Sequence, residues 1–101
     1  MSAVVIFHRL ARREYRAARQ HYEQISARTA ARFVQAVTRA VERIAENPNA
    51  WPEYCPHYRW VRTRRFPYLL IYRMLEPNFV VVVAVAHGRR RPGYWLRRMG
   101  R

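Results

Sequence analysis

The sequence predicts an α+β domain in which a helical hairpin packs on a small, mainly antiparallel β-sheet, in the order β-α-α-β-β-β and with a short basic C-terminal tail. Two stretches of helical periodicity follow one another almost without a break in the first half of the chain. In the second half, stretches of side chains either alternate in character from one residue to the next or are largely β-branched, and both patterns are typical of strands. Because 101 residues suffice for one domain and not for two, we expect residues 1–101 to fold together.

The first half contains an opening strand and the first helix. Residues 4–8 are a short β-prone run that can open the fold as a strand. The next stretch carries an apolar stripe whose members recur at spacings of four and three residues, as on one face of a helix. The stripe consists of Ala11, Tyr15, Ala18, Tyr22 and Ile25.

A second helix is predicted to begin after Ser26, whose side chain can cap the first turn, and to end at Asn47-Pro48. Its apolar stripe consists of Ala30, Phe33, Val34, Val37, Val41, Ile44 and Ala45. Almost no loop separates the two helices, so they must lie antiparallel as a hairpin.

Strands are expected after a proline-rich connection at residues 48–56. Residues 68–75 are rich in β-forming side chains, and residues 76–78, Glu-Pro-Asn, indicate a turn. Residues 58–64 show the residue-by-residue alternation of side chains that is typical of a strand. One face of that alternating strand would carry Tyr58, Trp60, Arg62 and Arg64.

The last predicted strand, residues 79–87, is almost wholly apolar and β-branched, which suits a central strand covered on both faces. Three arginines, residues 89–91, follow it directly. In the basic tail, residues 92–101, the pair Tyr94-Trp95 is expected to fold back onto the sheet.

Charge is the strongest compositional signal. The chain has 20 Arg and 6 Glu, no Lys and no Asp, and a formal net charge of +14. Residues 1–50 hold nine Arg and four Glu, and residues 51–101 hold eleven Arg and two Glu. Because such an excess repels itself in a compact state, it indicates a polyanion or an acidic protein as partner.

Several protein classes are not expected. The longest apolar run, residues 79–86, is far shorter than the roughly 20 residues of a membrane helix. Early arginines at positions 9, 12 and 13 are unlike a secretory signal, so a cytoplasmic protein without membrane contact is expected. The lone Cys55 cannot form an intramolecular disulfide, and the histidines lack metal-ligand spacing, so neither a metal nor a cofactor is predicted.

Three motifs in this order resemble the RelE/ParE-type toxins of type II toxin–antitoxin systems, with the ParE-like plasmid-stabilisation toxins as the nearer subgroup. They are the closing segment AVAHGRRRPGYW at residues 84–95, the middle strand with RFPY at 65–68 and IYR at 71–73, and the helix end VERIAENPNAWP at 41–52. The resemblance covers nearly the whole chain. It implies a growth-arresting toxin that a co-expressed acidic antitoxin neutralises by wrapping its surface in a toxin–antitoxin hetero-oligomer.

The resemblance leaves two targets open. ParE-like members poison DNA gyrase and lack a nuclease constellation, and this target is the preferred prediction. RelE-like members cut mRNA on the ribosome without a metal, and they carry a basic residue just before the tyrosine that matches Tyr72. That cation is missing here, because residues 68–71 read Tyr-Leu-Leu-Ile.

If the chain cleaves RNA, its candidate catalytic residues are His87, Arg89 and Tyr94. His87 would be the base, since nearby cations favour the neutral form of its imidazole. Arg89 would stabilise the phosphorane through guanidinium contacts. Tyr94 would be the acid, because the same cations favour its phenolate.

Two sets of arginines are predicted to bind partners. The antitoxin set lies on the second helix as like-charged i,i+4 pairs, which an acidic amphipathic helix would relieve while it also lends a strand to the sheet edge. This set consists of Arg28, Arg32, Arg39 and Arg43. The target-binding set consists of Arg62, Arg64, Arg89, Arg90, Arg91 and Trp95. A non-enzymatic nucleic-acid-binding protein remains a further alternative, since the charge suits that role.

Overall fold

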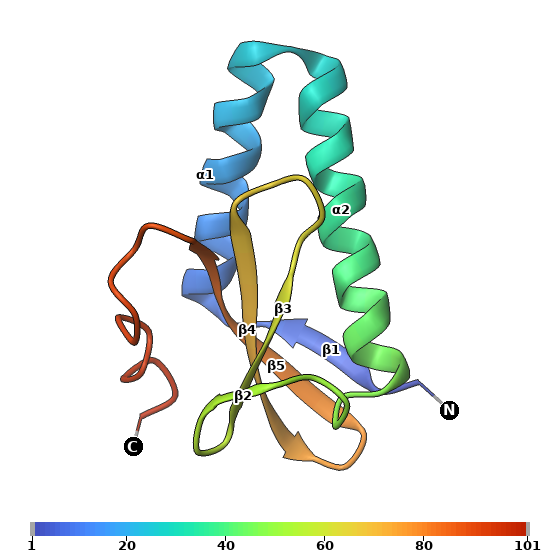
Figure 1. Cartoon of the computed structure of the whole chain (residues 1–101), viewed down its shortest axis with the longest axis vertical. Helices are drawn as coiled ribbons and strands as arrows, with labels where there is room; N and C mark the ends of the chain where they lie inside the picture. Colours follow the sequence, from blue (N-terminus) through green and yellow to red (C-terminus); the bar gives the residue numbers. More distant parts are fainter. Residues whose placement is uncertain (1, 101) are drawn as a thin grey trace.

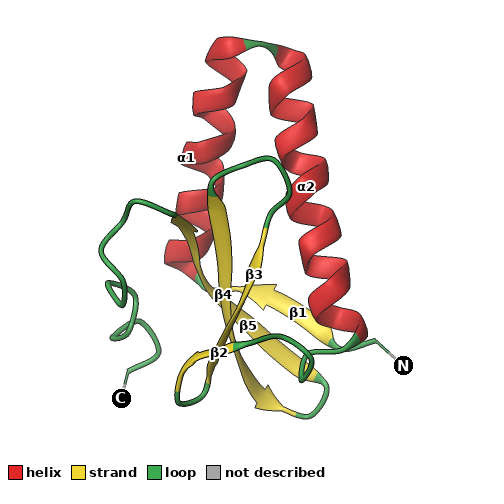
Figure 2. Cartoon of the chain, in the orientation of Figure 1, coloured by secondary structure: helices red, strands yellow, loops and turns green. Residues whose placement is uncertain are grey.

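The computed structural model describes residues 2–100, and it confirms the predicted α+β order with one additional strand. Figures 1 and 2 show a helical hairpin lying across one face of a twisted sheet. The elements are β1 (Val4–Phe7), α1 (Arg9–Ile25), α2 (Ala27–Glu46), β2 (Glu53–Cys55), β3 (Tyr58–Arg62), β4 (Tyr68–Glu76) and β5 (Phe79–His87).

The sheet has the strand order β1-β5-β4-β3-β2, so the last strand lies between the first strand and β4. β1 runs parallel to β5, with Val4 opposite Phe79, and the other neighbours are antiparallel. As predicted, β5 is covered on both faces: its residues from Val80 to Ala86 are at most 6% exposed.

Shared capping joins the two helices into the predicted hairpin. The Ser26 backbone N–H donates to the Tyr22 carbonyl at the end of α1, and the Ser26 hydroxyl accepts from the Thr29 N–H at 2.9 Å at the start of α2. The predicted place of Ile25 in the buried stripe is wrong, since Ile25 is 61% exposed. It ends α1 at the tip of the hairpin, which projects beyond the sheet (Figure 1).

The sheet separates two apolar cores. The helix-side core lies between the hairpin and the sheet and includes Phe33, Leu70, Tyr72 and Val82. Its aromatic rings pack closely, with the centroids of Tyr22 and Phe33 5.1 Å apart. The tail-side core lies on the opposite face and consists of Tyr58, Ile71, Val81, Val83, Ala84, Ala86 and Trp95. Alternation along β5 is interrupted at Val83 and Ala84, where the register between β4 and β5 shifts.

The C-terminal tail covers the second face of the sheet, as predicted from its aromatic pair. Trp95 is 2% exposed, and its ring lies 4.8 Å from that of Tyr58 and 5.7 Å from that of Tyr54. Tyr54 belongs to β2, the strand that the proline-rich stretch did not predict. Burying so large an aromatic ring makes the tail part of the fold.

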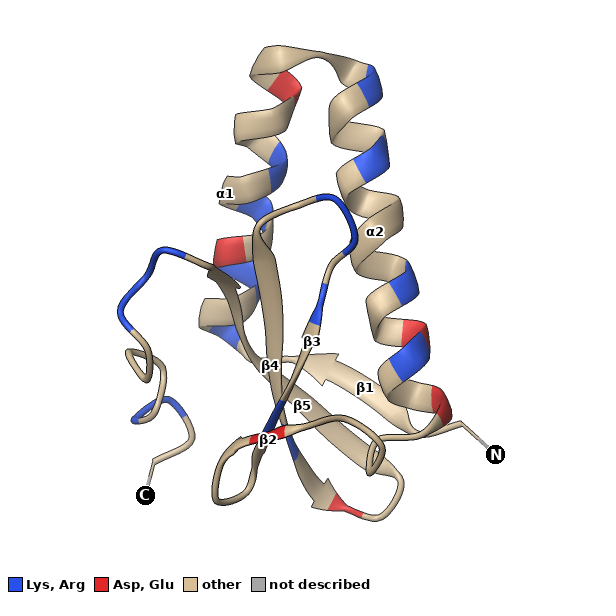
Figure 3. Cartoon of the chain, in the orientation of Figure 1, with Lys and Arg blue, Asp and Glu red and all other residues tan. Residues whose placement is uncertain are grey.

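The predicted strand at residues 58–64 is too long. β3 ends at Arg62, and the chain then turns at Arg64 and Arg65, whose φ of 69° lies in the left-handed region. Arg64 therefore does not share the strand face of Tyr58 and Trp60, contrary to the prediction. Arg64 instead lines a groove together with residues of α2. Figure 3 shows the basic turn between β3 and β4 next to that helix.

Candidate functional site

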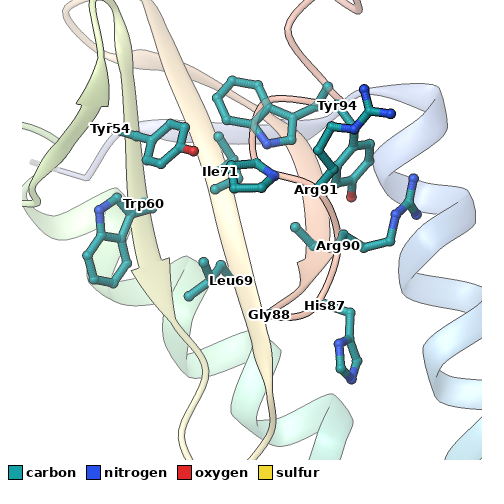
Figure 4. Close-up of a pocket in the computed structure, with 12 residues that line it drawn as sticks. Tyr54, Trp60, Leu69, Ile71, His87, Gly88, Arg90, Arg91 and Tyr94 are labelled. Atoms are coloured by element: carbon teal, nitrogen blue, oxygen red, sulfur yellow. The ribbon is translucent and has the colours of Figure 1, made fainter.

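The first candidate site is a pocket between the sheet and the C-terminal tail, which we call the tail pocket (Figure 4). It has a volume of about 260 Å³. Its apolar side chains include Trp60, Leu69, Ile71 and Trp95, and the turn after β5 adds Arg90 and Arg91. Trp95, a predicted target-binding residue, lines this pocket as a buried side chain and not as an exposed contact.

The three arginines after β5 have different surroundings. The Arg90 guanidinium lies 3.8 Å from the centre of the Tyr94 ring, and its Nη1 is 4.0 Å from Oε2 of Glu14. Arg91 is exposed and lines the tail pocket. Arg89 is exposed and lies outside the set of residues that line it. The pocket rim thus holds two of the three predicted cations: Arg90, which contacts Tyr94 and Glu14, and Arg91, which is exposed.

His87 and Tyr94 both line the tail pocket, but their side chains bond to different partners (Figure 4). The His87 ring packs edge-on against Tyr68 at 5.2 Å, on the side of the helix-side core, and its Nδ1 accepts from the Arg89 backbone N–H at 3.0 Å. Tyr94 packs against the tail-side core instead. Its hydroxyl donates to Oε2 of Glu14 at 2.7 Å.

Glu14 of α1 forms the densest polar network in the described chain, and the sequence reasoning missed it. Arg98 Nη1 donates to Glu14 Oε1 at 2.9 Å, and Arg98 Nη2 donates to Oε2 at 2.8 Å. The Val85 backbone N–H also donates to Oε1, at 2.9 Å. Arg98 Nη1 further donates to the Val83 carbonyl at 2.9 Å. β1 pairs with β5 only as far as Val82, and beyond that point Glu14 and Arg98 bind the free backbone groups of Val85 and Val83. The same ion pair attaches the tail to α1.

The protonation of this network follows from its contacts. Burial alone would raise the pKa of Glu14, but hydrogen bonds from Arg98, Tyr94 and the Val85 N–H outweigh it and hold that pKa below its ordinary value. Burial, followed by the hydrogen bond to Glu14, raises the pKa of Tyr94 far above its ordinary value. Arg90 and Arg98 lower the pKa of Tyr94, as expected of neighbouring cations, but burial and the Glu14 carboxylate outweigh them and keep the phenolic proton in place.

One sequence signal could have identified Glu14. It lies three residues after Ala11 and four before Ala18, both buried, so it belongs to the buried face of α1. A carboxylate on such a face requires a cationic partner. That partner, Arg98, is 84 residues away, and helix periodicity carries no information on a contact of that range.

The second candidate site is a basic groove between α2 and the β3–β4 turn, which we call the arginine groove. It has a volume of about 480 Å³. Figure 3 shows the basic positions of α2 and of this turn on neighbouring segments. The groove is lined by Thr29, Arg32, Gln35, Ala36, Arg39, Arg43, Arg64, Arg65 and Phe66. No acidic residue of the described chain is among them.

The arginine groove regroups the two predicted sets. Three members of the antitoxin set (Arg32, Arg39 and Arg43) line it, and Arg28 does not. Arg64 of the target-binding set joins them, separate from the arginines of the tail pocket. Arg62 is exposed, and its carbonyl accepts from Arg43 Nη2 at 3.2 Å. The predicted target-binding set is thus scattered: Arg90, Arg91 and Trp95 line the tail pocket, Arg64 lines the arginine groove, and Arg62 and Arg89 line neither.

Two kinds of feature matter in the part of the chain that the structure describes: grouped metal ligands and helices able to span a membrane. Among residues 2–100, no three His, Cys, Asp or Glu side chains are grouped so that they could hold a metal ion. No helix in that range combines the length and apolarity needed to cross a membrane.

Comparison with known proteins matches most of the chain to one family. Residues 5–92 match a family model described as ParE toxin of type II toxin-antitoxin system, parDE. Over 60 residues the chain is 38% identical to Toxin ParE2 from two strains of Mycobacterium tuberculosis, CDC 1551 / Oshkosh and ATCC 25618 / H37Rv. That alignment covers 59% of this chain and 53% of each relative, so the chain spans about half the length of the curated relatives it matches.

The fold is also similar to a solved chain from the chromosomal ParDE TA system of P. aeruginosa, with a TM-score of 0.71. The superposition covers 85% of this chain and 96% of that chain. At 19% sequence identity, this likeness concerns the arrangement of helices and strands.

Proposed function

We propose that this chain, which belongs to the ParE toxin family of type II toxin–antitoxin systems, arrests growth by inhibiting DNA gyrase and is neutralised by a cognate antitoxin. The observation that carries the proposal is the tail pocket. There a partly apolar surface presents cations at the exit of β5, and the Tyr94 hydroxyl donates its proton to Glu14. Such a surface is suited to binding a protein and poorly suited to proton transfer.

The proton-transfer groups support binding over cleavage. A general acid or base works best when its pKa lies near the working pH. Burial and the bond to Glu14 raise the pKa of Tyr94 far above that range. The Nδ1 atom of His87 already accepts a hydrogen bond from the Arg89 backbone N–H, and the His87 ring packs against Tyr68. RelE-like mRNA cleavage by His87, Arg89 and Tyr94 would require these groups to rearrange.

The target surface is proposed to consist of the exposed cations around the tail pocket. Arg89 and Arg91 are exposed, and Arg90 is held over Tyr94. Three guanidinium groups on one turn repel one another, and an acidic patch on gyrase would relieve that repulsion and accelerate association. Trp95, which follows this turn in the chain, is buried in the tail-side core and is not part of the proposed contact surface.

The antitoxin is proposed to be acidic and to cover the outer face of α2 in a toxin–antitoxin complex inside the cell. Arg28 and Arg32 are a like-charged i,i+4 pair, and both are exposed. Arg28→Glu with Arg32→Glu should therefore weaken binding of the antitoxin encoded beside this chain by tenfold or more, on the order of 1.4 kcal/mol, in titration calorimetry. Unchanged affinity would place the antitoxin elsewhere on the molecule.

One paired assay tests the proposed target. The purified chain is added to a gyrase supercoiling reaction and, separately, to translating ribosomes that carry a reporter mRNA. We expect loss of supercoiling and an intact mRNA. Cleavage of the mRNA together with normal supercoiling would overturn the gyrase proposal and favour the nuclease alternative.

A further inference from the structure

We propose that the arginine groove binds the phosphodiester backbone of nucleic acid. This inference goes beyond gyrase inhibition, because the groove and the tail pocket have no lining residue in common. The predicted ligand is a double- or single-stranded polynucleotide, bound through its phosphates without regard to base sequence.

The first argument is that the groove gathers cations from two elements with no internal compensation. Arg32, Arg39 and Arg43 come from α2, and Arg64 and Arg65 come from the β3–β4 turn. Within residues 2–100, the salt bridges involve other arginines and none of these five. Guanidinium groups recognise phosphate oxygens in a bidentate manner, so a phosphate chain would satisfy donors that the fold leaves open.

One of these cations is held in place and gives the groove a defined edge. Arg43 Nε donates to the Arg39 carbonyl at 3.4 Å, and Nη2 donates to the Arg62 carbonyl at 3.2 Å. The same guanidinium lies 5.9 Å from the centre of the Trp51 ring. Arg43 therefore presents charge to the groove with little loss of side-chain freedom on binding.

The second argument is backbone strain at Arg65. Its φ of 69° lies in the left-handed region, which a long side chain rarely adopts. Glycine would fit this turn without strain. The chain nevertheless places an arginine here, and that arginine lines the groove. Strain of this kind indicates that the position is used for a contact outside the fold.

The lining favours a nucleic acid over an acidic helix. An amphipathic helix needs apolar anchors in its groove, and here only Ala36 and Phe66 are apolar. The remaining neutral residues, Thr29 and Gln35, are side chains that commonly donate to phosphate and sugar oxygens. A surface that is polar and strongly positive is typical of protein–nucleic acid interfaces.

The length of the groove fits a short run of phosphates. Arg32 and Arg43 are 11 residues apart on α2, which corresponds to about 16 Å along a helix. One strand of duplex DNA carries a phosphate every 3.4 Å of axis, so about five phosphates span that distance. Arg32 also belongs to the surface proposed for the antitoxin, and Arg39 lies on the same helix, so the experiment uses the toxin free of antitoxin.

The test is fluorescence anisotropy with a labelled 20-base-pair duplex of arbitrary sequence, titrated with the purified toxin across a salt series. Arg39→Ala with Arg64→Ala removes one cation from each wall. We expect the affinity at about 0.1 M salt to fall tenfold or more, and the slope of log K against log salt to become shallower by about 1.8. The matched control is Arg13→Ala with Arg19→Ala, two exposed arginines of α1 outside the groove, which should leave the slope unchanged.

Arg65→Gly separates binding from folding. Glycine relieves the positive φ, so we expect an equal or higher melting temperature together with a salt slope that is shallower by about 0.9. Equal slopes for the groove and control double variants would overturn the inference. So would binding of a polyglutamate peptide without binding of the duplex. Gyrase inhibition that persists after either result would leave the proposed target intact, so the two proposals fail separately.

Discussion

At the scale of single residues, Glu14 organises the end of the chain. Its carboxylate receives four hydrogen bonds, from both terminal nitrogens of Arg98, from Tyr94 and from the Val85 backbone. The Glu14 side chain is 16% exposed and that of Arg98 is 12% exposed, so this ion pair is largely removed from water. Removing one partner of such a pair leaves a nearly buried charge uncompensated.

Glu14→Gln tests this role because it preserves shape and removes the charge. We expect the free energy of unfolding to fall by about 2–4 kcal/mol, since Arg98 and the Tyr94 hydroxyl lose an anionic acceptor. Urea denaturation followed by circular dichroism measures the loss. The chain supplies its own control in Glu23→Gln, which breaks the exposed Arg19–Glu23 pair of 3.6 Å. Exposed pairs contribute at most about 1 kcal/mol, so equal losses for the two variants would contradict the account.

The same network predicts a pH dependence. The pKa of Glu14 is lower in the folded chain than its ordinary value of 4.5, which is taken for the unfolded chain. The stabilising contribution is therefore fully present above pH 4.5 and is lost as the pH falls through the lower, folded pKa. The difference in unfolding free energy between the unsubstituted chain and Glu14→Gln should narrow below pH 4.5. A difference that stays constant down to pH 3 would show that the carboxylate charge does not stabilise the fold.

At the scale of elements, the tail acts as a second layer on the sheet. The hairpin covers one face, and Trp95 with its neighbours covers the other. Contacts of Trp95 with Tyr54 and Tyr58 join the tail to β2 and β3, while Arg98 joins it to α1. The turn with Arg89, Arg90 and Arg91 is therefore anchored at both ends, by β5 and by the tail.

Trp95→Ala should expose this face of the sheet. A buried tryptophan replaced by alanine costs about 3–5 kcal/mol, and we expect a loss of that size in chemical denaturation. Leu96→Ala is the matched control, because Leu96 is 46% exposed and its truncation should cost little. If Trp95→Ala proved no more destabilising than Leu96→Ala, the tail would not be part of the core in solution.

Elements with strong periodicity could be predicted, and short ones could not. The capping role of Ser26 follows from local spacing and is confirmed, and so is the burial of Ala30, Phe33, Val37 and Ile44 in the α2 stripe. Val34, Val41 and Ala45 are only half-buried, and Ala40, outside the predicted stripe, is buried. The three residues of β2 lie among prolines, and only their pairing with β3 makes them a strand. The predicted strand at residues 58–64 was too long because the alternating pattern of the sequence continues past Arg62, where β3 ends. Such a pattern carries no signal for the turn at Arg65.

At the scale of the whole molecule, part of the excess positive charge is gathered at two separate concave surfaces: Arg90 and Arg91 line the tail pocket, and five arginines line the arginine groove. Composition predicted an anionic partner but not the number of sites. Arg64 lies beside the arginines of α2 only because the chain turns after β3, and Glu14 binds Arg98, which is 84 residues away in the sequence. Both sets of neighbours therefore depend on tertiary contacts. The tail pocket is proposed for gyrase and the arginine groove for nucleic acid.

The most direct test of the proposed target surface is gyrase inhibition by Arg89→Ala with Arg91→Ala. Both side chains are exposed, and neither takes part in the Glu14 network, so folding should be unaffected. We predict that the concentration needed to block supercoiling rises by tenfold or more, while the control pair Arg13→Ala with Arg19→Ala inhibits like the unsubstituted chain. Equal inhibition by all three proteins would contradict the assignment of the exit of β5 as the target-binding surface.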